Sequence, residues 1–317
     1  MLTRLGLLLT RLTDRTPFTN VVGLARALLA VATLTTLLFD STDSLFVGLH
    51  SGGGVQPTCD GVGAFGAFCL GVPLEVVRWS AIAVLVAVIA GFRPQWTCIP
   101  HWYVAFSYQV NATVVDGGDQ LAAVVTVLLI PLCLVDTRRS HWRNEEDVPG
   151  VAYGRRLVAQ LSLVLVQVQV AVLYFDAGIA KLGTREWADG SAMYYWMGDP
   201  TFGAPQWQQW LFRPILTTGI TVTLFTWVVL FGEVALAFGV LVPWRHRKPF
   251  LYASVVFHLG IALMMGLVSF ALTMIAADLL AYHDARVPLR GRRRPDTASI
   301  PEVLEKQDHE PVAVGAK

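Results

Sequence analysis

Lys181 ends a long apolar run, and its type and position make it the residue of this sequence that most invites a chemical role. The chain has twenty arginines and only four lysines. Of the other three, Lys248 lies in a basic turn, and Lys306 and Lys317 lie in a polar C-terminal stretch. Arginine stays protonated in proteins, whereas burial can leave a lysine neutral and able to accept a proton. Lys181 is therefore a candidate base; the alternative is that its amine only reaches out to the membrane surface.

Two more ionisable residues, Glu233 and His258, lie inside apolar runs, where a charge costs about 2.5–3.5 kcal/mol on insertion scales. Glu233 lies ten residues before Pro243, and His258 lies nine residues after Pro249. This spacing predicts that both side chains lie at similar depth in the membrane, so we expect them to pair. In one interpretation the pair holds a proton or binds a polar head group, and both residues join Lys181 as catalytic candidates. In the other it is a structural hydrogen bond between packed helices.

Polar side chains recur along the apolar run that leads to Lys181. Four of them occupy every seventh position: Gln160, Gln167, Tyr174 and Lys181. This spacing places them on one helix face, which should look into the bundle because lipid cannot satisfy a glutamine. Asp176 lies about 140° around a regular helix from Lys181, so the two pair only if the helix breaks at Gly178. The residues expected to line a substrate or cofactor pocket are Tyr174, Asp176, Trp187, Asp189 and Gln167.

The four cysteines do not predict a metal site. Cys98 and Cys133 are separated by an apolar span. Cys59 and Cys69 share one Gly-rich external stretch, where oxidation is allowed. We expect a structural disulfide between them; a redox-active pair is the alternative, although no Cys-x-x-Cys spacing supports it.

The composition indicates a polytopic membrane protein. Hydrophobic residues make up 54% of the 317 and charged residues 15%, against about 25% charge in soluble domains. The net charge of +1 suggests no nucleic-acid partner. Basic residues gather in alternate short loops, which places the N-terminus in the cytoplasm. We expect an amphipathic cytoplasmic segment at 1–21, a transmembrane domain at 22–283 and a disordered cytoplasmic tail at 284–317.

The apolar runs predict an all-α transmembrane bundle of about seven or eight membrane segments. Six spans are expected at 22–39, 74–92, 98–115, 121–135, 157–178 and 215–242. The last tract, 250–282, gives roughly 50 Å of helix, less than the roughly 60 Å of two full spans. Because both its flanks are basic, we expect one span and a shorter return segment, with a break near Gly266.

The stretch YFDAGIAKLGTREWADG at 174–190 resembles the signature of the HTTM, or vitamin K-dependent γ-carboxylase-like, membrane domain. In that pattern an apolar helix ends in Tyr-Phe-x-Ala-Gly-x-x-Lys-Leu, followed by Trp-x-x-Gly. The resemblance implies that Lys181 is the counterpart of the lysine that deprotonates vitamin K hydroquinone in the carboxylase. It therefore implies a quinone as a cofactor candidate. The carboxylase has a second lysine beside the base, whereas this chain has Ala180.

Other segments resemble the sporulation-delaying protein B (SdpB) family. They are NVVGLARALLAVATLTTLLF at Asn20–Phe39, GFRPQWTCIPHWYVAFS at 91–107, DGGDQ at 116–120 and YYWMGDPTFG at 194–203. The resemblance implies a multi-pass protein of the bacterial cell membrane that matures a secreted peptide toxin, a bacteriocin, together with an SdpA-like partner protein. The implied partners are thus that protein, the secreted precursor peptide and membrane lipid.

Four functions remain open at this stage. The leading hypothesis is a maturation factor that is catalytic through Lys181 acting as a base on a quinol-like cofactor. The second is a non-catalytic scaffold or exporter of the precursor peptide, and the third is a γ-carboxylase-like enzyme. The fourth is thiol chemistry at Cys59 and Cys69 that installs a disulfide in the peptide.

Overall fold

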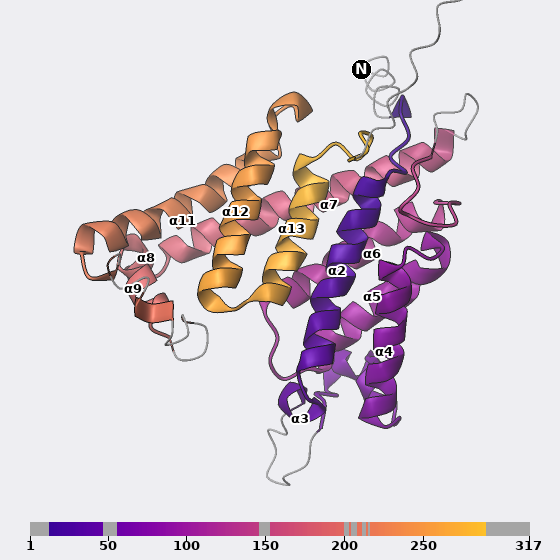
Figure 1. Ribbon diagram of the computed structural model, residues 1–317, viewed down its shortest axis with the longest axis horizontal. Helices are drawn as coiled ribbons and strands as arrows, with labels where there is room; N and C mark the ends of the chain where they lie inside the picture. Colours follow the sequence, from indigo (N-terminus) through magenta and orange to yellow (C-terminus); the bar gives the residue numbers. More distant parts are fainter. Residues whose placement is uncertain are drawn as a thin grey trace, which may run out of the picture.

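The computed structural model describes residues 13–46, 56–145, 153–199, 203, 208–210, 214 and 216–289, which form a bundle of α-helices (Figure 1). The helices are α2 (Asn20–Phe39), α3 (Thr42–Leu45), α4 (Leu74–Ile89), α5 (Pro94–Asn111), α6 (Gly117–Leu134), α7 (Tyr153–Leu182), α8 (Arg185–Ala188), α9 (Ala192–Met197), α11 (Gly219–Gly239), α12 (Lys248–Met265) and α13 (Val268–Tyr282). Short 3-10 helices η1 (Gly61–Phe65), η2 (Ala67–Cys69) and η3 (Trp244–His246) lie in the connections. Most of the expected N-terminal amphipathic segment and of the expected disordered tail lies outside the described residues.

The all-α membrane bundle predicted from the sequence is confirmed. Among the described residues, α2, α6, α7, α11 and α12 are long and apolar enough to cross a membrane. Helices α4, α5 and α13 complete the bundle. The 30-residue α7 is about 45 Å long and crosses α2, α12 and α13 obliquely (Figure 1). The sequence predicted that this span ends at Gly178, but the helix continues through Lys181 to Leu182.

The predicted break near Gly266 is confirmed. Gly266 has a φ of 73°, in the left-handed region that favours glycine, and its N–H donates to the Ala262 carbonyl at 3.0 Å. The chain therefore turns back at once, and α13 packs antiparallel against α12 (Figure 1). With 15 residues, α13 is the shorter return segment.

The core lies where α13 packs between α2 and the pair α6 and α7 (Figure 1). Small side chains on α13, including Ala276, Ala277 and Ala281, are fully buried and allow the helices to approach closely. By contrast α11 packs along α7, α12 packs along α13, and α11 and α12 meet each other only sparsely. The side chains between these two diverging helices are therefore supported mainly by α7 and α13.

A glycine lets α7 and α11 touch. A Cβ added at Gly178 would lie 2.8 Å from Cγ2 of Val234, which is closer than carbon atoms approach. Gly232, on α11 itself, has no atom within 4 Å of the corresponding position. Gly178 therefore sets the separation of the two helices next to Lys181.

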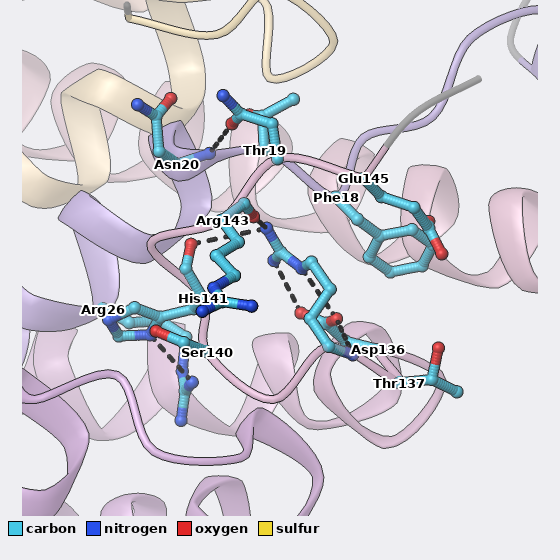
Figure 2. Close-up of polar contacts among 12 residues, drawn as sticks. Phe18, Thr19, Asn20, Arg26, Asp136, Thr137, Ser140, His141, Arg143 and Glu145 are labelled. Carbon is cyan, nitrogen blue, oxygen red and sulfur yellow. Dashed lines mark hydrogen bonds and ion pairs between the residues drawn. The ribbon is translucent and has the colours of Figure 1, made fainter.

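Buried arginines join the loops near the start of α2, at one end of the bundle (Figure 2). Arg26, 2% exposed, donates to Nδ1 of His141 at 3.2 Å and to Oγ1 of Thr97 at 3.0 Å. Arg138 binds both carboxylate oxygens of Asp136, at 2.8 and 2.6 Å. Burial, together with the charge of Arg26, lowers the pKa of His141 to about 3. Its imidazole is therefore neutral at pH 7 and accepts the hydrogen bond from Arg26.

Replacing Gly178 with Val should destabilise the protein, because the added atoms push α7 away from α11. Overpacking of this kind costs about 1–3 kcal/mol. The melting temperature of the detergent-solubilised protein should fall, whereas Gly232→Val should leave it nearly unchanged. Equal melting temperatures for the two variants would contradict the close contact at Gly178.

His141 should make the stability depend on pH. Its ordinary pKa of 6.5 applies in the unfolded chain and a pKa of about 3 in the folded protein. Between these values the unfolded state binds more protons, so the contribution of His141 is present above about pH 6.5 and is lost as the pH falls. At about 1.4 kcal/mol per pH unit, the loss reaches about 3 kcal/mol near pH 4.

This prediction is tested by melting wild type and His141→Gln between pH 7 and pH 4. The advantage of the wild type should shrink on acidification, whereas the exposed His246→Gln should track the wild type. An advantage that stays constant with pH would show that His141 is not the responsible group.

Candidate functional site

Lys181 lies in the last turn of α7, and its amine turns into the protein. Nζ donates to Oε2 of Glu233 at 2.7 Å and to Oε1 at 2.9 Å, and also to the Ala177 carbonyl at 3.3 Å. The Trp187 ring of α8 covers the amine, with its centroid 5.3 Å from Nζ. The side chains of Lys181 and Glu233 are 24% and 10% exposed. The amine is therefore held by an ion pair and an aromatic face rather than extended toward the membrane surface.

A cavity of about 210 Å³ adjoins this ion pair. Helices α6, α7, α11, α12 and α13 all contribute to its wall. The polar side chains that line it are Tyr174, Lys181, Glu233 and His258. The apolar ones are Leu173, Ala177, Phe257, Ile261, Phe270 and Met274. The catalytic candidates from the sequence thus share one small, mostly apolar chamber.

The expected pair of Glu233 with His258 is not what the structure contains, because each residue has another partner. Glu233 pairs with Lys181, and Nδ1 of His258 lies 3.4 Å from Oδ2 of Asp278. Equal depth fixes the position of a side chain along the membrane normal but not its direction around the helix axis. The two residues therefore line the same cavity from α11 and α12 without forming a pair.

Asp278 on α13 was missed by the sequence reasoning. It is 0% exposed, and the hydroxyl of Tyr174 donates to its two carboxylate oxygens, at 3.0 and 2.8 Å. A signal was present, because Asp278 is the single carboxylate in the tract 250–282. A carboxylate inside a membrane segment is costly, so it indicates a buried partner or a functional role.

Three predicted pocket residues lie away from the cavity. Asp176 is exposed, because α7 continues unbroken past Gly178 and keeps it on another face than Lys181. Asp189 is also exposed; it accepts hydrogen bonds from the hydroxyl and the N–H of Ser191, which lower its pKa. Gln167 lies two turns before Tyr174 on α7 and accepts a hydrogen bond from Arg247 at 3.4 Å. Trp187, in contrast, lies against Lys181.

Cys59 and Cys69 form a disulfide at the base of η1 and η2. Beside it, the side chain of Asn111 on α5 donates to the carbonyls of Thr58 and Gly63 at 2.9 and 2.8 Å. The disulfide thus closes a loop that is fixed against α5. In the part of the chain that the structure describes, no three His, Cys, Asp or Glu side chains are grouped to hold a metal ion.

Comparison with known proteins places these residues in a family. The HTTM domain matches residues 80–285, a range that includes the whole wall of the cavity. Uncharacterized protein YitO of Bacillus subtilis (strain 168) is 38% identical over 286 residues, covering 89% of this chain and 91% of the relative. Sporulation-delaying protein SdpB of the same organism is 36% identical over 271 residues, covering 84% of this chain and 82% of the relative. No solved structure matches significantly.

The domain match and the similarity to both relatives along most of their length agree with the helical membrane bundle and with the motifs around Lys181. The resemblance inferred from the sequence is thereby confirmed: this chain is a multi-pass membrane protein of the HTTM-domain family and is SdpB-like.

Proposed function

We propose that this chain matures a secreted peptide in a bacterial cell membrane and that Lys181 is the base of the reaction. The observation that carries the proposal is the amine of Lys181, held 2.7 Å from Glu233 at the wall of an apolar cavity. An interfacial anchor would have no need of a buried carboxylate partner. A base in a membrane needs a group that takes its proton and thereby returns the amine to its neutral form.

The Lys181–Glu233 pair provides such a group. The pair is neutral overall, either as ammonium and carboxylate or as amine and carboxylic acid. Its two forms differ by the shift of one proton along a hydrogen bond whose nitrogen and oxygen lie 2.7 Å apart. In the second form Nζ has a free electron pair and accepts a proton from a bound hydroxyl. The resulting ammonium then stabilises the oxyanion that it has created.

The cavity fits the polar ring of a quinol-like molecule. Its apolar side chains would contact the ring, and Lys181 and His258 are placed on the wall for hydrogen bonds to ring oxygens. A quinol would supply an acidic hydroxyl and a ring that can be oxidised after deprotonation. Access from the lipid is favoured by the divergence of α11 and α12, both of which line the cavity. The residues Tyr174 and Trp187 would hold the ligand and the base in place.

The biological setting is inferred from the relatives. The name of the SdpB relative connects it with sporulation delay, and the family resemblance implies a secreted peptide toxin as substrate and an SdpA-like protein as partner. We place in the cytoplasm the end of the bundle where α2 starts and α13 ends, which holds Arg26, Arg138 and Arg247. The start of α2 would then lie on the cytoplasmic side, in agreement with the expected cytoplasmic N-terminus, and the end of α7 that carries Lys181 would lie toward the outside.

A second candidate is a non-catalytic scaffold or exporter for the precursor peptide. The same ion pair favours it, because Lys181 and Glu233 tie α7 to α11 and so hold the bundle together. In that function only the positive charge matters, and an arginine would serve. γ-Carboxylation is a narrower form of the catalytic proposal, and the presence of Ala180 beside Lys181 argues against it.

Mass spectra of the secreted peptide from cells with wild type, Lys181→Ala or Lys181→Arg distinguish these functions. Removal of a general base lowers a rate by about 10²–10⁴-fold, so both variants should release almost only the precursor. Arginine keeps the charge and the pair with Glu233 but cannot become neutral.

The matched control is Asp176→Asn, which changes an exposed charge on the same helix and should leave maturation unchanged. Amounts of inserted protein must be equal in all strains. If Lys181→Arg restores the mature mass, the scaffold replaces the enzyme.

A further inference from the structure

The buried carboxylate of Asp278 needs a positive charge or a proton. It is 0% exposed and lies in the core between α7, α12 and α13. The cation nearest to the cavity, Lys181, is already paired with Glu233. Among the described residues, the ionisable group in contact with Asp278 that can become positive is His258, at 3.4 Å. A buried carboxylate without compensation is strongly disfavoured, so Asp278 and His258 should share a proton.

The hydrogen bond of His258 to Ser254 defines which ring nitrogen keeps its hydrogen. Nδ1 lies 2.8 Å from the Ser254 carbonyl, which can only accept a hydrogen bond. Nδ1 therefore carries a hydrogen. Nε2 is then the nitrogen that gains and loses the exchangeable proton, and the His258 side chain lines the cavity. Tyr174 fixes the other partner by donating to Asp278 at 2.8 Å.

We propose that His258 and Asp278 form a second proton-transfer unit, which donates a proton to the cavity ligand while Lys181 accepts one from it. This inference rests on the proposed function of the cavity. The ligand would be a molecule with two oxygen atoms, one that loses a proton to Lys181 and one that gains a proton from His258. Neither relative's name nor the domain match assigns such a role to Asp278.

The step conserves atoms and charge. At His258 the N–H bond of Nε2 breaks, its electron pair stays on nitrogen, and an O–H bond forms on the ligand. At Lys181 an O–H bond of the ligand breaks, its electron pair stays on oxygen, and an N–H bond forms on Nζ. The His258–Asp278 unit becomes more negative by one charge, and the Lys181–Glu233 pair becomes more positive by one. The summed charge of the buried groups is therefore unchanged, which avoids the large penalty for a new net charge in the membrane.

The other titratable groups that face the two units do not supply the proton that Asp278 and His258 share. Tyr174 and Tyr282 already donate, to Asp278 and to the Leu236 carbonyl respectively. Arg247 donates to carbonyls at the far end of α13, including that of Ala281. The proton in question therefore belongs to His258 and Asp278 together.

The test counts protons on this unit in ligand-free, full-length protein in lipid nanodiscs. Solid-state NMR of ¹⁵N-labelled histidine reports the protonation of His258; His258→Gln identifies its signal among the seven histidines. Infrared spectroscopy detects a protonated carboxyl group, and Asp278→Asn identifies its band. At pH 7 we expect one proton on the unit in addition to the hydrogen on Nδ1, seen as a His258 imidazolium or as a protonated Asp278.

In Asp278→Asn, which keeps the size of the side chain, His258 should be neutral. In Tyr174→Phe, which removes only the hydroxyl, the signals of the unit should shift without loss of the proton. The proposal is overturned if the wild type shows a neutral His258 together with an ionised Asp278. It is also overturned if His258 is still an imidazolium in Asp278→Asn.

A second readout is the secreted peptide. His258→Gln should lower the maturation rate at least about 100-fold, as loss of a general acid does, whereas the exposed His246→Gln should not. The proton count needs no ligand and no peptide. If the shared proton is found but the Lys181 variants mature the peptide normally, only the proposed function is refuted. If the shared proton is absent but the Lys181 variants fail to mature the peptide, only the His258–Asp278 unit is refuted.

Discussion

An ammonium group and a carboxylate 2.7 Å apart, Lys181 on α7 and Glu233 on α11, constrain the rest of this structure. Each charge alone would cost about 2.5–3.5 kcal/mol in a membrane segment, and together they are stable only if the two helices stay in register. The close approach at Gly178 keeps that register. The cavity then exists because α12 and α13 close the space beside this pair from the other side.

The return at Gly266 gives the cavity its second polar wall. Because α13 folds back against α12, His258 and Asp278 meet although 20 residues separate them in the chain. The helix that brings Asp278 is buried between α2, α6 and α7, so this carboxylate is part of the best-packed region of the bundle. The cavity thus lies between a rigid core on one side and the less supported α11 and α12 on the other.

The sequence predicted much of the bundle because the length of apolar runs, basic flanks and a helix-ending glycine are local signals. The confirmed break at Gly266 is one example. The sequence also singled out Lys181, Glu233, His258 and Tyr174, which line one cavity. Pairing was not predictable in the same way, since depth in the membrane does not define the direction of a side chain around its helix. For that reason the sequence wrongly predicted a pair of Glu233 with His258 and a place for Asp176 at the pocket. The contact of Asp278 with His258 was not predicted.

The most direct test of the central claim measures whether the Lys181 amine can become neutral by passing its proton to Glu233. A lipid-soluble, amine-reactive reagent is applied to the protein in nanodiscs at pH 7, and mass spectrometry compares the modification of Lys181 with that of the exposed Lys248. Only a neutral amine reacts, so the account predicts that Lys181 is modified as well as Lys248, because Glu233 takes up the proton of Lys181. If Lys248 is modified while Lys181 stays unreactive, Lys181 is a permanent ammonium that ties two helices, and the base must be sought elsewhere.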